Sequence, residues 1–361
     1  MDLTVILAFI IAFAVAMYVV MDGFDLGLGI LFPLFPEKRD RDVIMNSVAP
    51  VWDGNETWLV LGGGGLLAAF PLAYAIILPA LYMPLILMLL ALVFRGVAFE
   101  MRFRALTHRT QLWWDRSFSW GSYAATISQG IALGALVQGI RTDGRAYTGG
   151  WWDWLTPFSL FTAAALVIGY ALLGACWLVL KTEGNLQQRA RTLARVLAIA
   201  TLACIALVSL AMLFLYPAFR ARWLSLPNIL YAAPVPLLVA LLGWRLITSL
   251  ADDARPDTAR PDTGRHDTGR HDTGRPDTGR PDAIPFLCTL GLFLLSYTGL
   301  GISLWPHIVP PSITIWDAAA APSSQRFLLV GAAVLVPLIL AYTGYVYWLF
   351  RGKVQAGAGY H

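Results

Sequence analysis

Charged residues are scarce in this chain: Asp, Glu, Lys and Arg make up only 13% of its 361 residues, whereas 58% are hydrophobic. So little charge excludes an ordinary soluble domain, in which about a quarter of the residues are charged. The formal net charge of +4 is small and gives no reason to expect a nucleic-acid partner. The composition therefore predicts a membrane protein.

Histidine and cysteine are also rare, with five and three residues respectively. A b-type haem normally needs axial His, or His with Met, and no histidine lies in the middle of an apolar run. The five are His108, His266, His271, His307 and His361. The cysteines lie in separate apolar runs without the spacing of metal ligands. We therefore expect no haem or metal to be bound by this chain alone.

Long stretches without Asp, Glu, Lys or Arg are abundant, and runs of about 20 apolar residues are typical of spanning helices. These stretches cover residues 3–21, 57–94, 117–140, 154–180, 196–219, 223–244, 283–316 and 327–350. The run 57–94 is long enough for two helices, divided by a tight hairpin near Pro71 and Pro79. We recognise no signal peptide, so the first helix is expected to be retained. The sequence predicts one all-α membrane domain over residues 1–361 with nine transmembrane helices.

The basic residues are unevenly divided between the two ends of these helices. If the N-terminus lies outside, the outer segments hold only Arg141, Arg145, Arg220, Arg222 and Arg326 of the 26 Lys and Arg residues. Loops on the cytoplasmic side carry an excess of Lys and Arg. This asymmetry predicts a periplasmic N-terminus and a cytoplasmic C-terminus.

One segment is of low complexity. Residues 255–282 repeat the pattern Arg-Pro/His-Asp-Thr-Gly/Ala in steps of five. Such a segment has almost nothing to bury, so we expect residues 251–283 to form a disordered cytoplasmic loop between helices seven and eight.

Two pairs of acids lie next to the apolar runs. Asp22 and Asp25 are three residues apart, as are Asp53 and Glu56, so each pair shares a face if its segment is helical. Acids are stabilising at a helix N-terminus, which would account for Asp53 and Glu56. Asp22 and Asp25 are expected just before a helix C-terminus, where negative charge is unfavourable. For them a proton-conducting or cofactor-tuning role stands beside a structural one.

Arg95 ends the long apolar run and lies nearly two turns deeper than Arg102 and Arg104. Arg102 and Arg104 are expected to extend to the inner membrane surface. Arg95 is expected to pair with an acid such as Asp25, Asp53 or Glu100.

Several segments resemble one known family. Residues 18–31 contain Met-Asp-Gly-Phe-Asp-Leu-Gly, and residues 46–58 end in Trp-Asp-Gly-Asn-Glu-Thr-Trp. Together with residues 94–100, 316–318 and 336–343, these segments resemble subunit II of the cytochrome bd-type quinol oxidases. The residues around Asn55 and Glu56 are most similar to the cyanide-insensitive branch.

The resemblance implies two four-helix bundles plus a peripheral helix, in a bacterial inner membrane. It implies a heterodimer with a subunit I that carries the ubiquinol site, haem b and haem d (or haem b only). That complex oxidises quinol and reduces O2 to water, and this chain alone is not the catalyst. Small single-span subunits, and a structural quinone or lipid, are further partners that the family allows.

The resemblance also carries roles to particular residues. Asp53 and Glu100 resemble acids on the family's proton path from the cytoplasm, and Arg104 a basic residue at its entrance. The remaining motif positions are expected to line or support that path: Asp25, Trp52, Asn55, Glu56 and Arg95.

Two other classes of protein are alternatives to an oxidase subunit. A proton-coupled transporter would need a midplane site between two related halves, and neither acidic motif recurs in residues 180–361. A purely structural scaffold would lack the proton role, and replacing Asp53 or Glu100 distinguishes it.

Deleting residues 255–282 is expected to leave assembly and oxidase turnover unchanged, because the repeat has little to bury. The measurement is the yield and O2 consumption of the tagged complex. A large loss of either would show that the repeat has a role.

Overall fold

The structure is a computed structural model that describes residues 2–251 and 282–354. The long helices are α1 (Leu3–Leu31), α3 (Trp52–Ala69), α5 (Tyr82–Phe103), α6 (His108–Gln138), α7 (Pro157–Lys181), α8 (Gly184–Leu215), α11 (Pro234–Ala251), α12 (Ala283–Leu304) and α14 (Pro322–Leu349). The shorter helices are η1 (Phe32–Leu34), α2 (Lys38–Val48), α4 (Pro71–Ala80), α9 (Pro217–Leu224), α10 (Asn228–Ala232) and α13 (Ile315–Ala318). Two small antiparallel hairpins pair β1 (Thr142–Asp143) with β2 (Ala146–Tyr147) and β3 (His307–Val309) with β4 (Ile313–Thr314).

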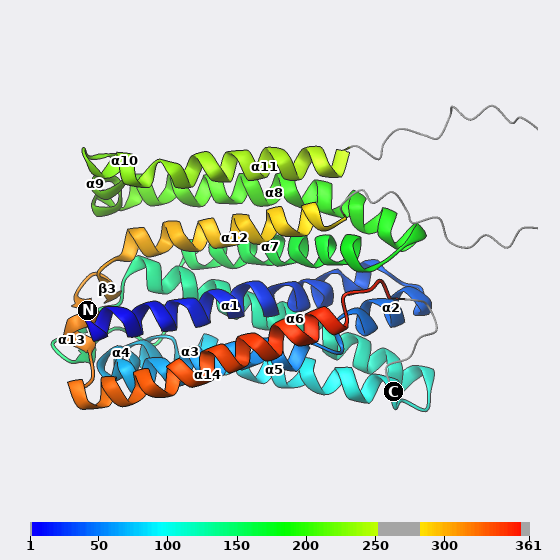
Figure 1. Cartoon of the computed structure of the whole chain (residues 1–361), viewed down its shortest axis with the longest axis horizontal. Helices are drawn as coiled ribbons and strands as arrows, with labels where there is room; N and C mark the ends of the chain where they lie inside the picture. The colour runs from blue at the N-terminus through cyan, green and yellow to red at the C-terminus, as the bar shows by residue number, and fades with distance from the viewer. Residues whose placement is uncertain (1, 252–281, 355–361) are drawn as a thin grey trace, which may run out of the picture.

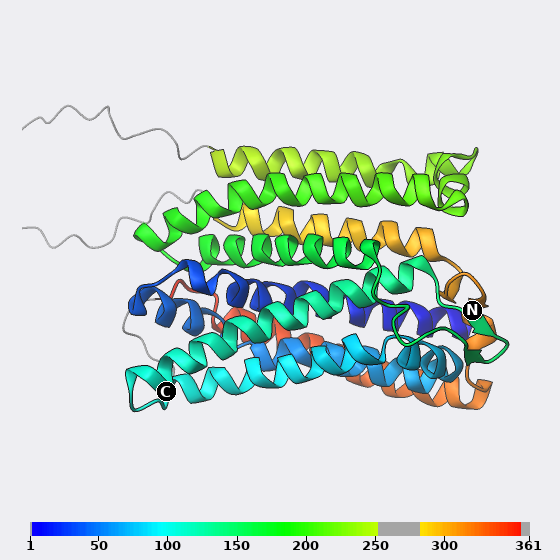
Figure 2. The same ribbon diagram turned by 180° about the vertical axis from the view of Figure 1, so that it is seen from behind.

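The long helices run side by side along the long axis of the molecule (Figure 1). Helices α1, α3, α5 and α6 form one group of four, and α7, α8, α11 and α12 form another. Helix α14 packs against α1 and α3 at the edge of the first group. The view from behind shows α6 running obliquely across the first group, from beside α5 towards α7 of the second group (Figure 2). This arrangement agrees with the expected two bundles and peripheral helix.

Seven helical segments are long and apolar enough to cross a membrane, namely α1, α5, α7, α8, α10 with α11, α12 and α14. Helices α3 and α6 lie parallel to these but are more polar. Asp53, Asn55 and Glu56 fall in the first turns of α3, and α6 begins with charged residues and continues with many Ser, Thr and Gly. Membrane crossing by nine helices therefore stays a prediction.

The expected tight hairpin near Pro71 and Pro79 is wrong, because the ten-residue helix α4 forms there. Pro71 occupies its first turn, where the missing N–H has no helical partner to lose. Pro79 is tolerated one residue before the helix ends, so α3 and α5 are joined by a short helix rather than a turn.

The two ends of the bundle differ in charge. The start of α1 lies at the same end as α4, α9, α10 and α13, whereas α2 and the end of α14 lie at the other end (Figure 1). The basic residues of α2 and those before α6 therefore belong to one end of the molecule. The predicted repeat loop 251–283 lies outside the described residues except for its first residue and its last two.

Small residues allow the two bundles to touch along α1 and α7. A Cβ atom added to Gly27 would lie 1.8 Å from the backbone oxygen of Tyr170, and one added to Gly174 would lie 2.5 Å from the backbone carbon of Gly27. These contacts are between backbones, so no side-chain movement could relieve them. Glycine is required at both positions because helix α7 passes directly over α1.

Gly27→Ala is therefore expected to destabilise the folded chain by about 1–3 kcal/mol, the range for overpacking a close-packed contact. The measurement is the thermal melting of the purified complex. Gly301→Ala is the matched control, because a Cβ at Gly301 in α12 meets nothing within 4 Å. Equal melting temperatures for the two variants would contradict the close contact.

Candidate functional site: a buried arginine–carboxylate cluster

Asp22 and Asp25 lie within helix α1 rather than near its end. The helix continues through Gly23 to Leu31, and both side chains are completely buried. The expectation that they precede a helix C-terminus was wrong. Because they are three residues apart, both project from one face of α1, and Tyr18 projects from the same face one turn earlier. This face points into the first bundle.

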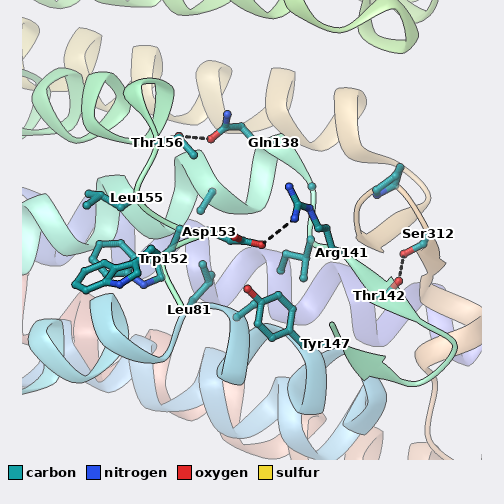
Figure 3. A pocket seen from close by; sticks show the side chains of 16 residues that line it. Leu81, Gln138, Arg141, Thr142, Tyr147, Trp152, Asp153, Leu155, Thr156 and Ser312 are labelled. Atoms are coloured by element: carbon teal, nitrogen blue, oxygen red, sulfur yellow. Dashed lines mark hydrogen bonds and ion pairs between the residues drawn. The ribbon is translucent and has the colours of Figure 1, made fainter. Parts of the chain in front are cut away.

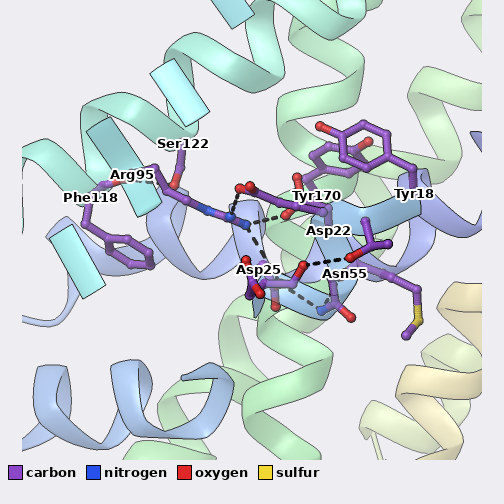
Figure 4. Close-up of polar contacts among 12 residues, drawn as sticks. Tyr18, Asp22, Asp25, Asn55, Arg95, Phe118, Ser122 and Tyr170 are labelled. Carbon is purple, nitrogen blue, oxygen red and sulfur yellow. Dashed lines mark hydrogen bonds and ion pairs between the residues drawn. The ribbon is translucent and has the colours of Figure 1, made fainter. Parts of the chain in front are cut away.

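Arg95 of α5 reaches across to these acids (Figure 4). Its Nη2 pairs with Asp22 and lies 3.8 Å from Oδ2 of Asp25, while its Nη1 pairs with Glu56 of α3. The predicted pairing with Asp25 is confirmed, but Asp22 and Glu56 make the closer contacts. We call Asp22, Asp25, Asn55, Glu56 and Arg95 the Arg95 cluster.

Asn55 joins the cluster to the peripheral helix. Its Nδ2 donates to Oδ2 of Asp25 at 2.8 Å, and its Oδ1 accepts from the hydroxyl of Tyr347 in α14 at 3.0 Å. Trp52 stacks on Phe99 with ring centroids 5.0 Å apart, and the guanidinium of Arg95 lies 5.9 Å from the Trp52 ring. The cluster thus holds α1, α3, α5 and α14 in one arrangement.

Negative charge is in excess in this cluster. Three carboxyl groups surround one guanidinium, and Arg95, Asp22 and Asp25 are fully buried. Oδ2 of Asp22 and Oδ1 of Asp25 have no hydrogen-bond partner. A buried charge is stable only when it is paired and hydrogen-bonded. The arrangement therefore favours holding a proton on one or more of the carboxyl groups.

Three predicted path residues lie outside the cluster. Asp53 is exposed on α3. The side chains of Glu100 in α5 and of Arg104, which directly follows α5, are 61% and 72% exposed. Arg104 pairs with Glu100 at 3.0 Å, one helical turn apart. Pairing of Arg95 with Asp53 or Glu100 is therefore wrong. Glu56 lies between the two regions, because its side chain is 26% exposed although it contacts the buried Arg95.

Helical geometry explains which acids join the cluster. Trp52, Asn55 and Glu56 lie at positions i, i+3 and i+4 of α3, so the face that brings Trp52 to Arg95 also brings Glu56. Asp53 is about 100° from Trp52 around the axis of the same helix, so its side chain does not reach Arg95. The interpretation of Glu56 as a helix-terminal acid missed this spacing, although the sequence contained it.

A second buried network lies closer to the helix ends. Arg102 is 1% exposed, and it bonds Asp115 at 2.5 Å and Asp42 at 2.7 Å. Arg41 bonds the other oxygen of Asp115 at 2.8 Å. The expectation that Arg102 extends to the surface is wrong, because Arg95 and Arg102 are seven residues apart and share the buried face of α5. This network fixes α2, α5 and α6 together.

The motif residues Trp316 and Asp317 have structural contacts at the other end of the bundle. The Trp316 indole donates to Asp2 at 2.7 Å, which lowers the pKa of that carboxyl. The Thr314 hydroxyl donates to Asp317 at 2.6 Å, and this bond lowers the pKa of Asp317. Both acids are thereby held ionised at the ends of α1 and α13.

A cavity of about 690 Å³ opens at this same end (Figure 3). Its wall contains an Arg141–Asp153 pair at 3.7 Å and hydrogen bonds from Thr156 to Gln138 and between Thr142 and Ser312. The side chain of Arg141 is 78% exposed, so its ion pair contributes little energy. The cavity has both polar and apolar side chains in its wall and lies between the β1–β2 hairpin, residues 152–156 and the chain around Ser312.

The Arg95 cluster does not fit a haem. Its donors are carboxylates, an amide and a guanidinium, with no histidine among them. The described histidines are His108, at the start of α6, and His307, in β3. Within residues 2–251 and 282–354, no three His, Cys, Asp or Glu side chains are grouped to hold a metal ion.

Fold and site define a multi-pass membrane subunit whose ionisable groups are buried between helices. A family model described as cytochrome bd terminal oxidase subunit II matches residues 3–350. The chain belongs to that family. It is therefore a multi-pass protein of the bacterial inner membrane and one subunit of an oxidoreductase complex.

Relatives support this placement along the whole chain. Cytochrome bd-I ubiquinol oxidase subunit 2 of Escherichia coli (strain K12) is 30% identical over 93% of this chain and 91% of that protein. Cytochrome bd ubiquinol oxidase subunit 2 of Bacillus subtilis is 24% identical over 93% of this chain and 92% of its own length. A solved bd oxidase chain from Geobacillus thermodenitrificans has the same fold, with a TM-score of 0.72 at 18% identity, over 97% of this chain and 99% of that chain.

Arg95→Gln is expected to destabilise the folded chain by about 3–5 kcal/mol, because it leaves buried carboxylates without their cation. The measurement is the amount of complex recovered from membranes and its melting temperature. Adding Asp22→Asn to this variant should restore part of the loss, since one unpaired acid is then removed.

The control for recovery is Arg104→Gln, directly after the same helix. Its pair with Glu100 is exposed, and such pairs contribute about 0–1 kcal/mol. Normal recovery and melting of Arg95→Gln would contradict the view that the cluster holds the first bundle together.

Proposed function

We propose that this chain supplies part of a proton path from the cytoplasm in a cytochrome bd-type quinol oxidase. The observation that carries the proposal is the Arg95 cluster, in which three carboxyl groups share one buried guanidinium. Acids at membrane depth usually face a protein interior or a water-filled path, and many of them carry protons. Because the cluster has more carboxyl groups than cations, at least one carboxylate can accept a proton.

The surface end of the path is assigned to Asp53, Glu100 and Arg104. Asp53 and Glu56 are one helical turn apart on α3 and about 60° apart around its axis, so exposed Asp53 is the acid next to Glu56 on the outer side of the helix. Glu56 then contacts Arg95, whose other partners are Asp22 and Asp25. Trp52 and Asn55 support this route by fixing the positions of Arg95 and Asp25.

The partner in this proposal is a haem-bearing subunit I, which forms a heterodimer with this chain. Small single-span subunits are further candidate partners of that heterodimer. We place haem b and haem d (or haem b only) in that partner, together with the ubiquinol site, since relatives of this chain are named ubiquinol oxidase subunits. The similarity of Asn55-Glu56-Thr57 to the cyanide-insensitive branch is part of the same proposal. A structural quinone or lipid in this chain is a further part.

In this proposal all nine long helices cross the membrane. The N-terminus is then periplasmic, and the basic ends of α2, α5 and α6 are cytoplasmic, in agreement with the excess of Lys and Arg on that side. The Arg95 cluster lies between these basic ends and the membrane centre. Protons for water would thus come from the cytoplasm.

The exposed face of α3 is the surface we assign to subunit I. It carries exposed Asp53, and Cβ atoms added to Gly63 or Gly64 would meet nothing within 4 Å. A charged residue and two open glycines suit a close helix–helix contact better than lipid. Docking there would cover Asp53 and place it between the two subunits.

The test is oxidase turnover of Asp53→Asn and Glu100→Gln in the tagged, purified complex. Turnover is expected to fall by up to about 100-fold, the low end of what a positioned proton-transferring side chain contributes. Haem content, read from the reduced-minus-oxidised spectrum, should stay normal because both residues are exposed.

Asp143→Asn is the control, since Asp143 lies in β1, whose Thr142 bonds Ser312 beside the β3 strand at the opposite end of the bundle (Figure 1). Full turnover in both path variants would mean that the chain is a scaffold without a proton role. Loss of haem together with turnover would assign these acids to assembly instead.

A further inference from the structure

Helix α6 presents a stripe of basic and aromatic side chains on its outer face. Arg109, Trp113, Arg116, Trp120 and Tyr123 are spaced at i, i+4, i+7, i+11 and i+14, which places them on one side of the helix. Trp113 is 62% exposed and Trp120 is 71% exposed. The stripe starts at the charged end of the molecule and leads into the charge-free run that begins at residue 117.

A groove of about 560 Å³ lies beside this stripe. Arg116, Trp120 and Tyr123 of α6 form one side, and Phe32, Pro33 and Arg41 contribute the other. Asp115 also lines the groove, but its two oxygens already bond Arg102 and Arg41. The acid is thus neutralised by its own partners and does not repel an anion.

The charge of Arg116 is available to a ligand. The contact that its guanidinium makes is with the Trp113 ring, 5.8 Å from the centroid. Among the residues that the structure describes, no acidic side chain pairs with Arg116. The groove therefore combines a cation without an acidic partner, two aromatic side chains and an apolar wall.

We propose that this groove binds the headgroup and upper acyl chain of one anionic phospholipid. An arginine suits a phosphate because it offers several N–H donors in a fixed plane. Trp and Tyr are favoured at the level of lipid headgroups. Arg116 is the last charged residue of the stripe, and Trp120 and Tyr123 follow it in the charge-free run, which is the order of layers in one leaflet. The inference needs the membrane placement of α6 and does not depend on the proton path.

A lipid fits this groove better than a soluble anion or a protein segment. A soluble phosphate would need the charge of Arg116 but would gain nothing from Trp120 and Tyr123 beside it. A lipid uses both parts, and Trp120 can remain largely exposed because the bilayer itself covers it. Bound lipid would contact α6, η1 and α2 together, next to the buried Arg102–Asp115 network.

The experiment titrates the delipidated complex with phosphatidylglycerol or phosphatidylcholine and counts bound lipids by native mass spectrometry. We expect one tightly bound phosphatidylglycerol per complex and no equivalent phosphatidylcholine. Arg116→Gln should weaken this binding by at least about fivefold, the effect of one basic residue on an anionic lipid. Arg116→Lys keeps the charge and should retain most of the binding.

The matched control is Arg39→Gln, which removes an exposed arginine from α2 at the same end but outside the groove. Four results would overturn the proposal: equal binding of the two lipids, equal weakening by Arg39→Gln and Arg116→Gln, displacement of the lipid by millimolar inorganic phosphate, or a photo-crosslink from position 120 that captures a protein subunit instead of lipid.

Discussion

The contact of Arg95 with three carboxyl groups is the interaction on which the first bundle depends. It joins α1, α3 and α5 at one point, and Asn55 extends the connection to α14 through Tyr347. Desolvating these charges is unfavourable, so the helices must be placed accurately enough for every partner to reach Arg95. A slip of one helix along another would leave a buried charge without its partner. The cluster thereby selects one packing of helices that hydrophobic contacts alone would not distinguish.

The two bundles are held together by different kinds of contact. The buried ion pairs of the Arg95 cluster and of the Arg102–Asp115 network belong to the first bundle and its adjoining helix α2. The second bundle meets α1 through close backbone contacts at Gly27 and Gly174 and through aromatic packing of Trp177 on Phe24, with ring centroids 4.3 Å apart. The second bundle thus supports the helix that carries Asp22 and Asp25 through close apolar contacts. The protonatable groups are thus held on the side where α3 and α5 are exposed.

The partners of the polar and charged side chains differ with depth in the molecule. Deep in the bundle, charges are paired with one another. Nearer the basic helix ends, Arg102 and Arg41 neutralise the charge of Asp115, while Arg116 extends outward beside aromatic side chains. At the opposite end, Asp2 and Asp317 take hydrogen bonds from Trp316 and Thr314. The same residue types therefore have different roles because their depth and neighbours differ.

The sequence by itself determined the positions of the long helices, since uninterrupted apolar runs and flanking charges are local properties of the chain. It also determined the family, because the two acidic motifs are distinctive. Only the tertiary structure decided that Arg95 pairs with Asp22 and Glu56 and not with Asp53 or Glu100. It also decided that Arg102 is buried. Those outcomes depend on the rotation of each helix about its axis. Rotation is set by packing between helices such as α1 and α7, which contact each other across more than a hundred residues of sequence.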